Sequence, residues 1–94
     1  MIVVGDDSGK RIPLTRPRAI IGRTSAADIR VDDANVSRRH AMIVGQGGRF
    51  LVTDLGSTNP AHVNGQPLAK PWPLQPGDVV RIGDVELRYQ EQQA

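Results

Sequence analysis

The 94-residue sequence lacks cysteine, which excludes disulfides, thiolate metal sites and a cysteine nucleophile. Aromatic residues are scarce, since the chain has one Phe, one Trp and one Tyr. The longest apolar runs, such as residues 1–4 and 41–44, are far shorter than the roughly 20 residues of a membrane-spanning helix. The first residues also lack the order of a secretory signal peptide. We therefore expect a small soluble domain in the cytoplasm, with no membrane partner.

A large excess of charge of either sign is also missing, because the chain has 12 basic and 10 acidic residues and a net charge of only +2. Counterion-driven binding to a nucleic acid normally needs a stronger positive charge. Ten of the twelve basic residues are arginine, whose forked guanidinium suits phosphate or carboxylate. Residues 1–47 hold eight basic and five acidic residues. We expect one local anion site there.

Short β-rich runs separated by turn residues fill the chain, and no segment has sustained helical periodicity. Val85, Leu87 and Tyr89 alternate with polar residues, which predicts an antiparallel strand with one buried face. The pattern as a whole predicts an all-β sandwich or barrel. The expected strands are 1–4, 11–14, 18–21, 28–31, 41–44, 50–54, 61–63, 79–82 and 85–89, with hairpin turns at 45–48, 64–65 and 83–84.

A proline-rich segment follows the turn at residues 64–65. Four prolines between residues 67 and 76 predict irregular structure or at best an edge strand there. Trp72 lies among these prolines, and we expect its ring to close one end of the core.

Polar residues cluster in four of the expected loops. Each cluster alone is typical of ordinary turns. Together they offer what an oxyanion needs, namely a fixed cation from Arg23 and hydroxyl groups from Ser37 and Thr58. Loops displayed by a rigid sandwich are a common place for such recognition residues. The clusters are Gly22 with Arg23, residues 37–40, residues 57–59, and Asn64 with Gly65.

These clusters resemble, in order and spacing, the signature of forkhead-associated (FHA) domains. The similarity extends over about residues 20–85 and includes the S-x-x-H pattern of Ser37 and His40. The resemblance implies a sandwich of two twisted, mostly antiparallel sheets with about eleven short strands and recognition loops at one end. It also implies one domain over residues 1–94. Because FHA domains usually sit in larger proteins, the chain could be part of a longer one.

The resemblance further implies a non-catalytic module that binds phosphothreonine peptides, without a cofactor or metal, in kinase signalling. A phosphothreonine carries about −1.5 to −2 charge and three acceptor oxygens, which an arginine and two hydroxyl groups can satisfy. The expected partner is a threonine-phosphorylated protein, such as a Ser/Thr kinase or a kinase substrate. No nucleic-acid partner is implied, and we assume a monomer.

Individual roles follow from the matching positions of the family. The phosphate contacts implied by the resemblance are Arg23, Ser37 and Thr58. Arg38 would reach the phosphate or the peptide backbone, and Asn59 would bond the peptide main chain. Asn35 would influence the choice of residue three places after the phosphothreonine. The positions expected to shape loops are Gly22, His40, Asn64 and Gly65.

The chain departs from the family at one place. Pro60 and Ala61 follow Asn59, where the family commonly has Gly-Thr. Proline removes a backbone donor and pushes the preceding residue toward an extended conformation. We expect the Thr58 hydroxyl to be unaffected, and the pose of Asn59 and the peptide preference to change.

Several other interpretations stay open at this level. An FHA-type fold could bind an unphosphorylated surface or an intramolecular partner, since fold does not fix function. The arginine content leaves room for a small basic β-domain that binds nucleic acid. A hydrolase would need Ser37, His40 and Asp54 as a triad, but no G-x-S-x-G elbow is present. A zinc site would have to use His40 and His62 without cysteine.

Overall fold

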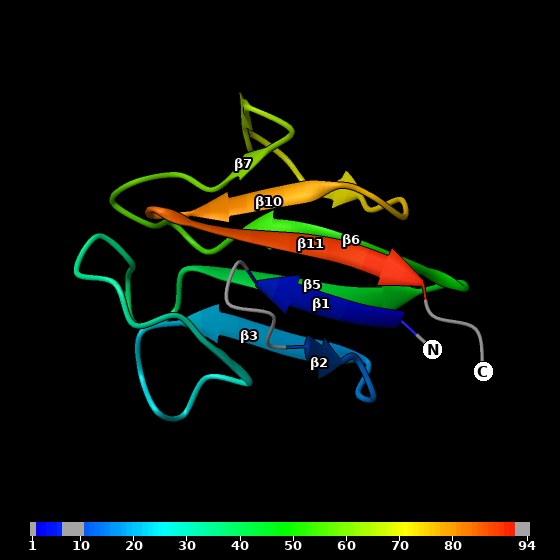
Figure 1. Cartoon of the computed structure of the whole chain (residues 1–94). Helices are drawn as coiled ribbons and strands as arrows, with labels where there is room; N and C mark the ends of the chain where they lie inside the picture. Colours follow the sequence, from blue (N-terminus) through cyan, green and yellow to red (C-terminus); the bar gives the residue numbers. More distant parts are fainter. Residues whose placement is uncertain (1, 7–10, 92–94) are drawn as a thin grey trace.

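The computed structural model describes residues 2–6 and 11–91, which form two β-sheets packed face to face (Figure 1). The strands are β1 (Ile2–Asp6), β2 (Arg11–Pro13), β3 (Arg18–Gly22), β4 (Ile29–Arg30), β5 (Ala41–Gln46), β6 (Arg49–Asp54), β7 (His62–Val63), β8 (Gln66–Pro67), β9 (Trp72–Pro73), β10 (Val79–Ile82) and β11 (Val85–Glu91). The described residues contain no helix that could cross a membrane.

The sheets have six and five strands. The larger one has the order β2-β1-β11-β10-β7-β8, and the smaller one has the order β4-β3-β5-β6-β9. Neighbouring strands with a recorded register run antiparallel, except that β3 and β4 run parallel. The predicted sandwich of two mostly antiparallel sheets is confirmed.

The core lies between the two sheets and follows the alternation of the strands. Ile21 and Ile43 of the smaller sheet and Ile82 of the larger one are fully buried. Each such side chain contributes about 1.5–3 kcal/mol through burial alone. In β11, Leu87 and Tyr89 are buried and Arg88 between them is exposed, as the alternating pattern predicts.

The hairpin turns follow the local sequence, with one difference. Residues 64–65 and 83–84 link short antiparallel strands as predicted. Between β5 and β6, however, the strands continue further than expected, and the turn consists of Gly47 and Gly48 alone. Both glycines have positive φ, at 58° and 81°, so two residues suffice where we expected four.

The expectation that Trp72 closes one end of the core is wrong. Trp72 lies in β9, an edge strand of the smaller sheet, and its side chain is 39% exposed. Its indole N–H donates to Asp78 at 3.4 Å, just before β10 of the other sheet. Trp72 therefore links the edges of the two sheets at the surface.

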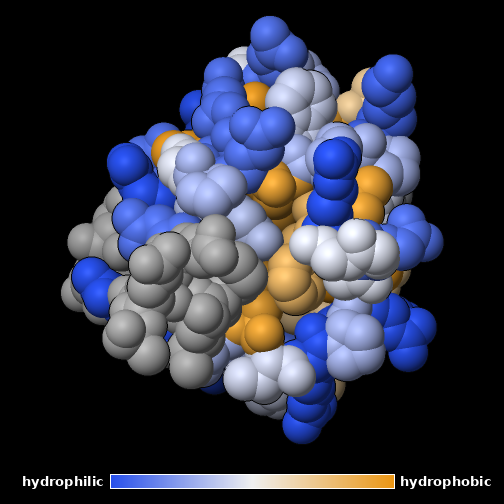
Figure 2. All heavy atoms as spheres, turned by 90° about the vertical axis from the view of Figure 1, so that its right-hand side faces the viewer, coloured by the Kyte–Doolittle hydropathy of each residue, from blue (hydrophilic) through white to orange (hydrophobic). Residues whose placement is uncertain are grey.

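Three long loops project from one end of the sandwich. Residues 23–28, 31–40 and 55–61 lie on the left in Figure 1, whereas β1 begins and β11 ends on the right. Figure 2 shows that opposite end, where apolar surface is visible between hydrophilic side chains. The loops that carry the predicted site residues therefore share one end of the molecule.

Candidate functional site

Three backbone segments meet at Gly22, the last residue of β3. A Cβ atom at Gly22 would lie 1.9 Å from the carbonyl oxygen of Arg38, so this approach requires glycine. The backbone N–H of Arg23 donates to the carbonyl of Ser37 at 3.1 Å. The N–H of Val31 donates to the carbonyl of Gly22 at 2.8 Å. Together these contacts fix the residues around β4 and the Ser37 loop against the end of β3.

His40 holds the Ser37 loop from inside the core. Its side chain is fully buried, and Nδ1 accepts the backbone N–H of Ser37 at 3.1 Å. The backbone of His40 donates to Ile21 at 2.8 Å and accepts from Leu55 at 3.0 Å. Because Nδ1 accepts, the proton of the neutral ring lies on Nε2, which is buried without a hydrogen-bond partner. His40 thus connects β3 to two of the three long loops.

The carboxylate of Asp54 organises the loop of residues 55–61. Oδ1 accepts the backbone N–H groups of Gly56 at 2.9 Å and Ser57 at 2.8 Å. Oδ2 lies 2.7 Å from Ser57 Oγ and accepts the N–H of Ala61 at 3.0 Å. The side chain therefore ties both ends of this loop to the end of β6.

This hydrogen bonding also affects the titration of Asp54. Partial burial raises the pKa of Asp54, but the bonds from Ser57 Oγ and from three backbone N–H groups outweigh it, so the pKa lies below its ordinary value. The ionised carboxylate is therefore the form that holds the loop. The loop depends on the charge of Asp54.

Asn59 connects the 55–61 loop to the 31–40 loop. Its Nδ2 donates to the carbonyl of Asn35 at 3.3 Å. Its own carbonyl lies 3.0 Å from Ser57 Oγ, which shares its single proton with Asp54. The exposed Pro60 follows, and the N–H of Ala61 is bound beyond it. The chain is thus held on both sides of Pro60 although that residue has no donor.

Asp33 fixes the position of Asn35. Its carboxylate accepts the N–H of Asn35 at 2.8 Å and the N–H of Asp84 at 3.0 Å. These two bonds, in that order of strength, hold the pKa of Asp33 below its ordinary value. The 31–40 loop is therefore tied to the turn between β10 and β11.

Two hollows open among these loops. Arg23 and Arg38 line the first, together with Arg30, Thr24 and Asp32. None of the three arginine side chains has a hydrogen bond or an ion pair with the described residues. The first hollow therefore presents to a ligand three guanidinium groups that have no partner in the described part of the chain.

The second hollow lies where Asn59 contacts Asn35. Asn35, Asn59 and Pro60 line it together with Arg81 and Asp84 from the β10–β11 hairpin. Its charges are of both signs, and Arg81 already donates through Nε to the carbonyl of Gly83 at 3.2 Å.

The remaining predicted residues lie elsewhere. Ser37 is half-buried and Thr58 is exposed, and neither lines these two hollows. Asn64 and Gly65 form the turn between β7 and β8 and line neither hollow as well.

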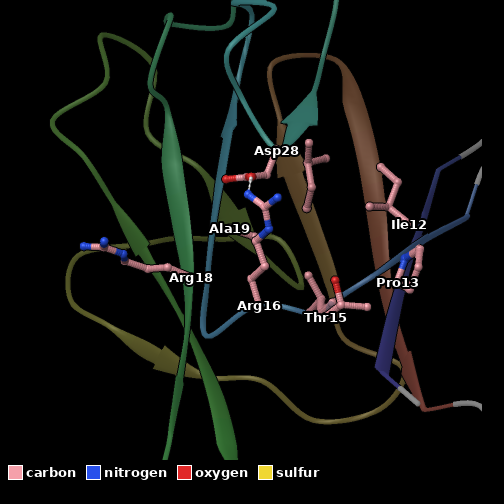
Figure 3. Close-up of a pocket in the computed structure, with 9 residues that line it drawn as sticks. Ile12, Pro13, Thr15, Arg16, Arg18, Ala19 and Asp28 are labelled. Carbon is pink, nitrogen blue, oxygen red and sulfur yellow. Dashed lines mark hydrogen bonds and ion pairs between the residues drawn. The ribbon is translucent and has the colours of Figure 1, made fainter.

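A separate pocket lies between β2 and β4, at the open edges of the two sheets (Figure 3). Its lining mixes apolar residues, among them Ile12 and Ile29, with the charged Arg16, Arg18 and Asp28. The guanidinium of Arg16 in this pocket lies 3.5 Å from Asp28, and the two form an ion pair. Because this cation is already neutralised, the pocket is a poorer anion site than the first hollow.

Comparison with known proteins identifies the family. The family model of the FHA domain matches residues 19–83 of this chain. The chain belongs to the FHA domain family. The membership that the sequence motifs predicted is thus confirmed.

Relatives of this FHA domain include an enzyme inhibitor and a transcriptional regulatory protein. The oxoglutarate dehydrogenase inhibitor of Corynebacterium diphtheriae is 43% identical over 97% of this chain and 64% of its own length. The transcriptional regulatory protein EmbR of Mycobacterium tuberculosis is 41% identical over 88% of this chain and 21% of its own length. This FHA domain therefore covers less than two thirds of the length of either relative.

Solved FHA domains share the whole architecture. The FHA domain of FhaA, in complex with the intracellular domain of Rv3910, has a TM-score of 0.90 and 38% identity, covering 96% of this chain and all of that one. Mycobacterium tuberculosis EmbR, in complex with a low affinity phosphopeptide, has a TM-score of 0.91 and 38% identity, covering 95% of this chain and 24% of that one.

The geometry of this FHA domain does not assemble the hydrolase triad. His40 Nδ1 faces the backbone N–H of Ser37, and the carboxylate of Asp54 is occupied by its own loop. Within residues 2–6 and 11–91, no group of three or more His, Cys, Asp or Glu could hold a metal ion.

Some residues of the FHA domain that line the hollows escaped the sequence analysis. Arg30 and Arg81 sit at exposed strand positions without a motif of their own. Asp54 has no loop role in the motif interpretation, although an Asp shortly before Gly-Ser, as in Asp54-Leu55-Gly56-Ser57, is typical of a turn in which the carboxylate accepts backbone N–H groups. That pattern was the available signal for its role.

Proposed function

We propose that this FHA domain binds threonine-phosphorylated proteins through its loop end and so mediates phosphorylation-dependent interactions in kinase signalling. The observation that carries the proposal is the pair Arg23 and Arg38, which share one hollow and have no acidic partner among the described residues. The partner is a Ser/Thr kinase or a kinase substrate. The solved structure of Mycobacterium tuberculosis EmbR, which is 38% identical to this chain, is a complex with a phosphopeptide. That complex supports phosphopeptide binding as the function of this domain.

We assign the phosphate contacts to Arg23, Ser37 and Thr58. An arginine fork supplies charge-assisted hydrogen bonds, and two hydroxyl groups serve the remaining oxygens. An unmodified threonine has no charge to pair with Arg23, so phosphorylation switches binding on.

The peptide contacts fall to Arg38, Asn59 and Asn35. Arg38 reaches the phosphate or the peptide backbone. The Asn59 amide has a second N–H besides the one bound to Asn35, and its oxygen accepts, so it can bond the peptide main chain. Asn35 lines the second hollow and influences the residue three places after the phosphothreonine.

The proposed domain spans residues 1–94 and acts in the cytoplasm by binding alone, without catalysis, cofactor or nucleic acid. His40 and Gly22 shape the site without touching the ligand, and so do Asn64 and Gly65 in their turn.

The test is a titration of the domain with a phosphothreonine peptide, chosen from an oriented peptide library, and with its unphosphorylated and phosphoserine counterparts. We expect micromolar binding of the first and much weaker binding of the other two. Arg23→Ala should lower the affinity at least about tenfold without unfolding, because charged hydrogen bonds contribute about 1.5–3 kcal/mol. Arg88→Ala, an exposed arginine of β11, is the matched control. Equal affinity for the phosphorylated and unphosphorylated peptides would contradict the proposal and would instead support an FHA-type fold that binds an unphosphorylated partner.

A further inference from the structure

Arg30 is a third cation in the hollow of Arg23 and Arg38. The roles proposed for a single phosphate involve Arg23 and Arg38 but leave Arg30 without a function. The hollow is lined by three guanidinium groups and one carboxylate, that of Asp32. No ion pair joins Asp32 to these arginines.

The backbone places Arg30 firmly beside the phosphate-binding residues. In the parallel pairing of β3 and β4, Arg30 lies opposite Gly22, the residue before Arg23. Its two neighbours, Ile29 and Val31, are 1% and 3% exposed and anchor the strand in the core. Because side chains alternate along a strand, Arg30 must point outward.

The free state of Arg30 contrasts with the nearby Arg16. Arg16 pairs with Asp28 at 3.5 Å (Figure 3). Asp28 also accepts the backbone N–H of Ile20 at 2.8 Å. Among the described residues, the three cations of this hollow have no ion pair. Asp32 offsets one of their charges, and negative charge from a ligand relieves the repulsion that remains. One phosphothreonine carries at most about two negative charges, so Arg23 and Arg38 together are enough to neutralise it.

We propose that Arg30 binds a second anionic group on the same partner, either an acidic side chain or a second phosphate close to the phosphothreonine. This inference rests on the proposed function and specifies its ligand: a phosphothreonine motif with additional negative charge.

The structure also predicts that negative charge on the peptide raises affinity on only one side of the phosphothreonine. The second hollow, on the side of Asn35 and Asn59, contains Asp84 as well as Arg81, and Arg81 is already engaged with Gly83. Negative charge should therefore increase affinity on only one flank of the phosphothreonine, the flank that lies over Arg30.

The experiment compares peptides that share one phosphothreonine and differ in their flanks. The set has neutral flanks, acidic residues before the phosphothreonine, acidic residues after it, and a second phosphothreonine on the flank that responds to charge. For the wild-type domain we expect one acidic flank to raise affinity about fivefold and a second phosphate to raise it further.

Variants then assign the gain to a residue. Arg30→Gln should abolish the gain and leave the affinity for the neutral-flank peptide within about twofold, and Arg30→Lys should keep part of the gain because the charge remains. Asp32→Asn should enlarge the gain, and Arg88→Gln should leave it unchanged. The gain should also shrink at high salt, since the groups are exposed.

Two results would overturn the inference while leaving the proposed function intact. The first is that neither acidic flank nor a second phosphate raises affinity, although the neutral-flank phosphopeptide binds better than its unphosphorylated counterpart. The second is that Arg30→Gln shows the same gain as the wild type, which would assign the gain to the general charge of the domain. Failure of every phosphopeptide would refute both the proposed function and this inference.

Discussion

At the scale of single residues, the site depends on close contacts that particular side chains allow. The carbonyl of Arg38 occupies the space where any residue other than glycine would place a Cβ at position 22. The approach brings Arg38 beside Arg23, although 15 positions separate the two in the sequence. His40 and Asp54 act similarly, since each uses its side chain to bind backbone N–H groups of a recognition loop.

His40→Ala should lower the free energy of unfolding and have little effect on the phosphopeptide affinity of the folded domain. The substitution leaves a cavity in a fully buried position and removes the acceptor of the Ser37 N–H, which together should lower the free energy of unfolding by about 2–4 kcal/mol. Urea denaturation measures the loss, and titration below the transition measures binding. A large loss of affinity with unchanged stability would show that His40 contacts the ligand.

Asp54 should make stability depend on acid pH. Its folded-state pKa lies below the ordinary value of 3.8, so its contribution is fully present above that value and is lost as the pH falls through the folded pKa. Asp54→Asn should cost about 1 kcal/mol at neutral pH, and the difference from wild type should narrow below pH 4. Thermal unfolding at pH 3 to 7 measures this. A difference that stays constant over the whole range would contradict the assignment.

At the scale of elements, one side chain strengthens the attachment of the short β7–β8 hairpin to β10, in addition to the backbone pairing of β7 with β10. Asn64 has a φ of 51°, its Oδ1 accepts the N–H of Val79 at 3.0 Å, and its Nδ2 donates to Asp78 at 3.1 Å. The Asn-Gly pair therefore sets both the conformation of the turn and its attachment to the sheet. The turn is predictable from the Asn-Gly pair, whereas the hydrogen bonds of the Asn64 side chain to Asp78 and Val79 are seen only in the structure.

Substitutions at Asn64 should separate these two effects. Asn64→Gly removes the two side-chain hydrogen bonds but tolerates positive φ, whereas Asn64→Ala also strains the backbone. We expect stability to fall by about 1 kcal/mol for the glycine variant and by about 1 kcal/mol more for alanine. Phosphopeptide affinity should not change, because the turn lines neither hollow. Equal stability of the two variants would contradict a role for backbone conformation.

At the scale of the whole molecule, the position of charge matters more than its total. The net charge is only +2, yet three arginines without an ion pair to any described residue share one hollow at the loop end. β1 and β11, the first and last described strands, pair with each other. β1 begins and β11 ends at the end of the molecule opposite to these loops (Figure 1). The loop end is thus left free for a partner.

This charge distribution predicts different salt dependences for two kinds of ligand. Phosphopeptide binding should weaken only modestly between 50 and 500 mM NaCl, since few charges take part. Binding to oligonucleotides should be weak and should fall steeply over the same range, because it would rely on counterion release. Fluorescence polarisation with labelled ligands measures both. Strong oligonucleotide binding at physiological salt would favour the nucleic-acid interpretation.

The fold class, the positions of the hairpins and the family are predictable from the sequence alone. Alternation, Asn-Gly turns and the spacing of the motifs are local properties, so they can be recognised without coordinates. Errors arose where distant segments decide the outcome. Trp72 lies on a sheet edge instead of closing one end of the core, because β9 is the edge strand next to β6 in the described sheet. The turn at Gly47 and Gly48 is shorter than expected because β5 and β6 continue pairing up to it.

The place of Arg30 in the site depends on chain packing. Arg23 and Arg38 lie in motifs that point to an anion site, whereas nothing in the local pattern distinguishes Arg30 from Arg16, which pairs with an aspartate. The close approach at Gly22 and the parallel pairing of β3 with β4 bring the three to one hollow. Local sequence specifies strands and turns, but a binding site forms from residues that only chain packing brings together.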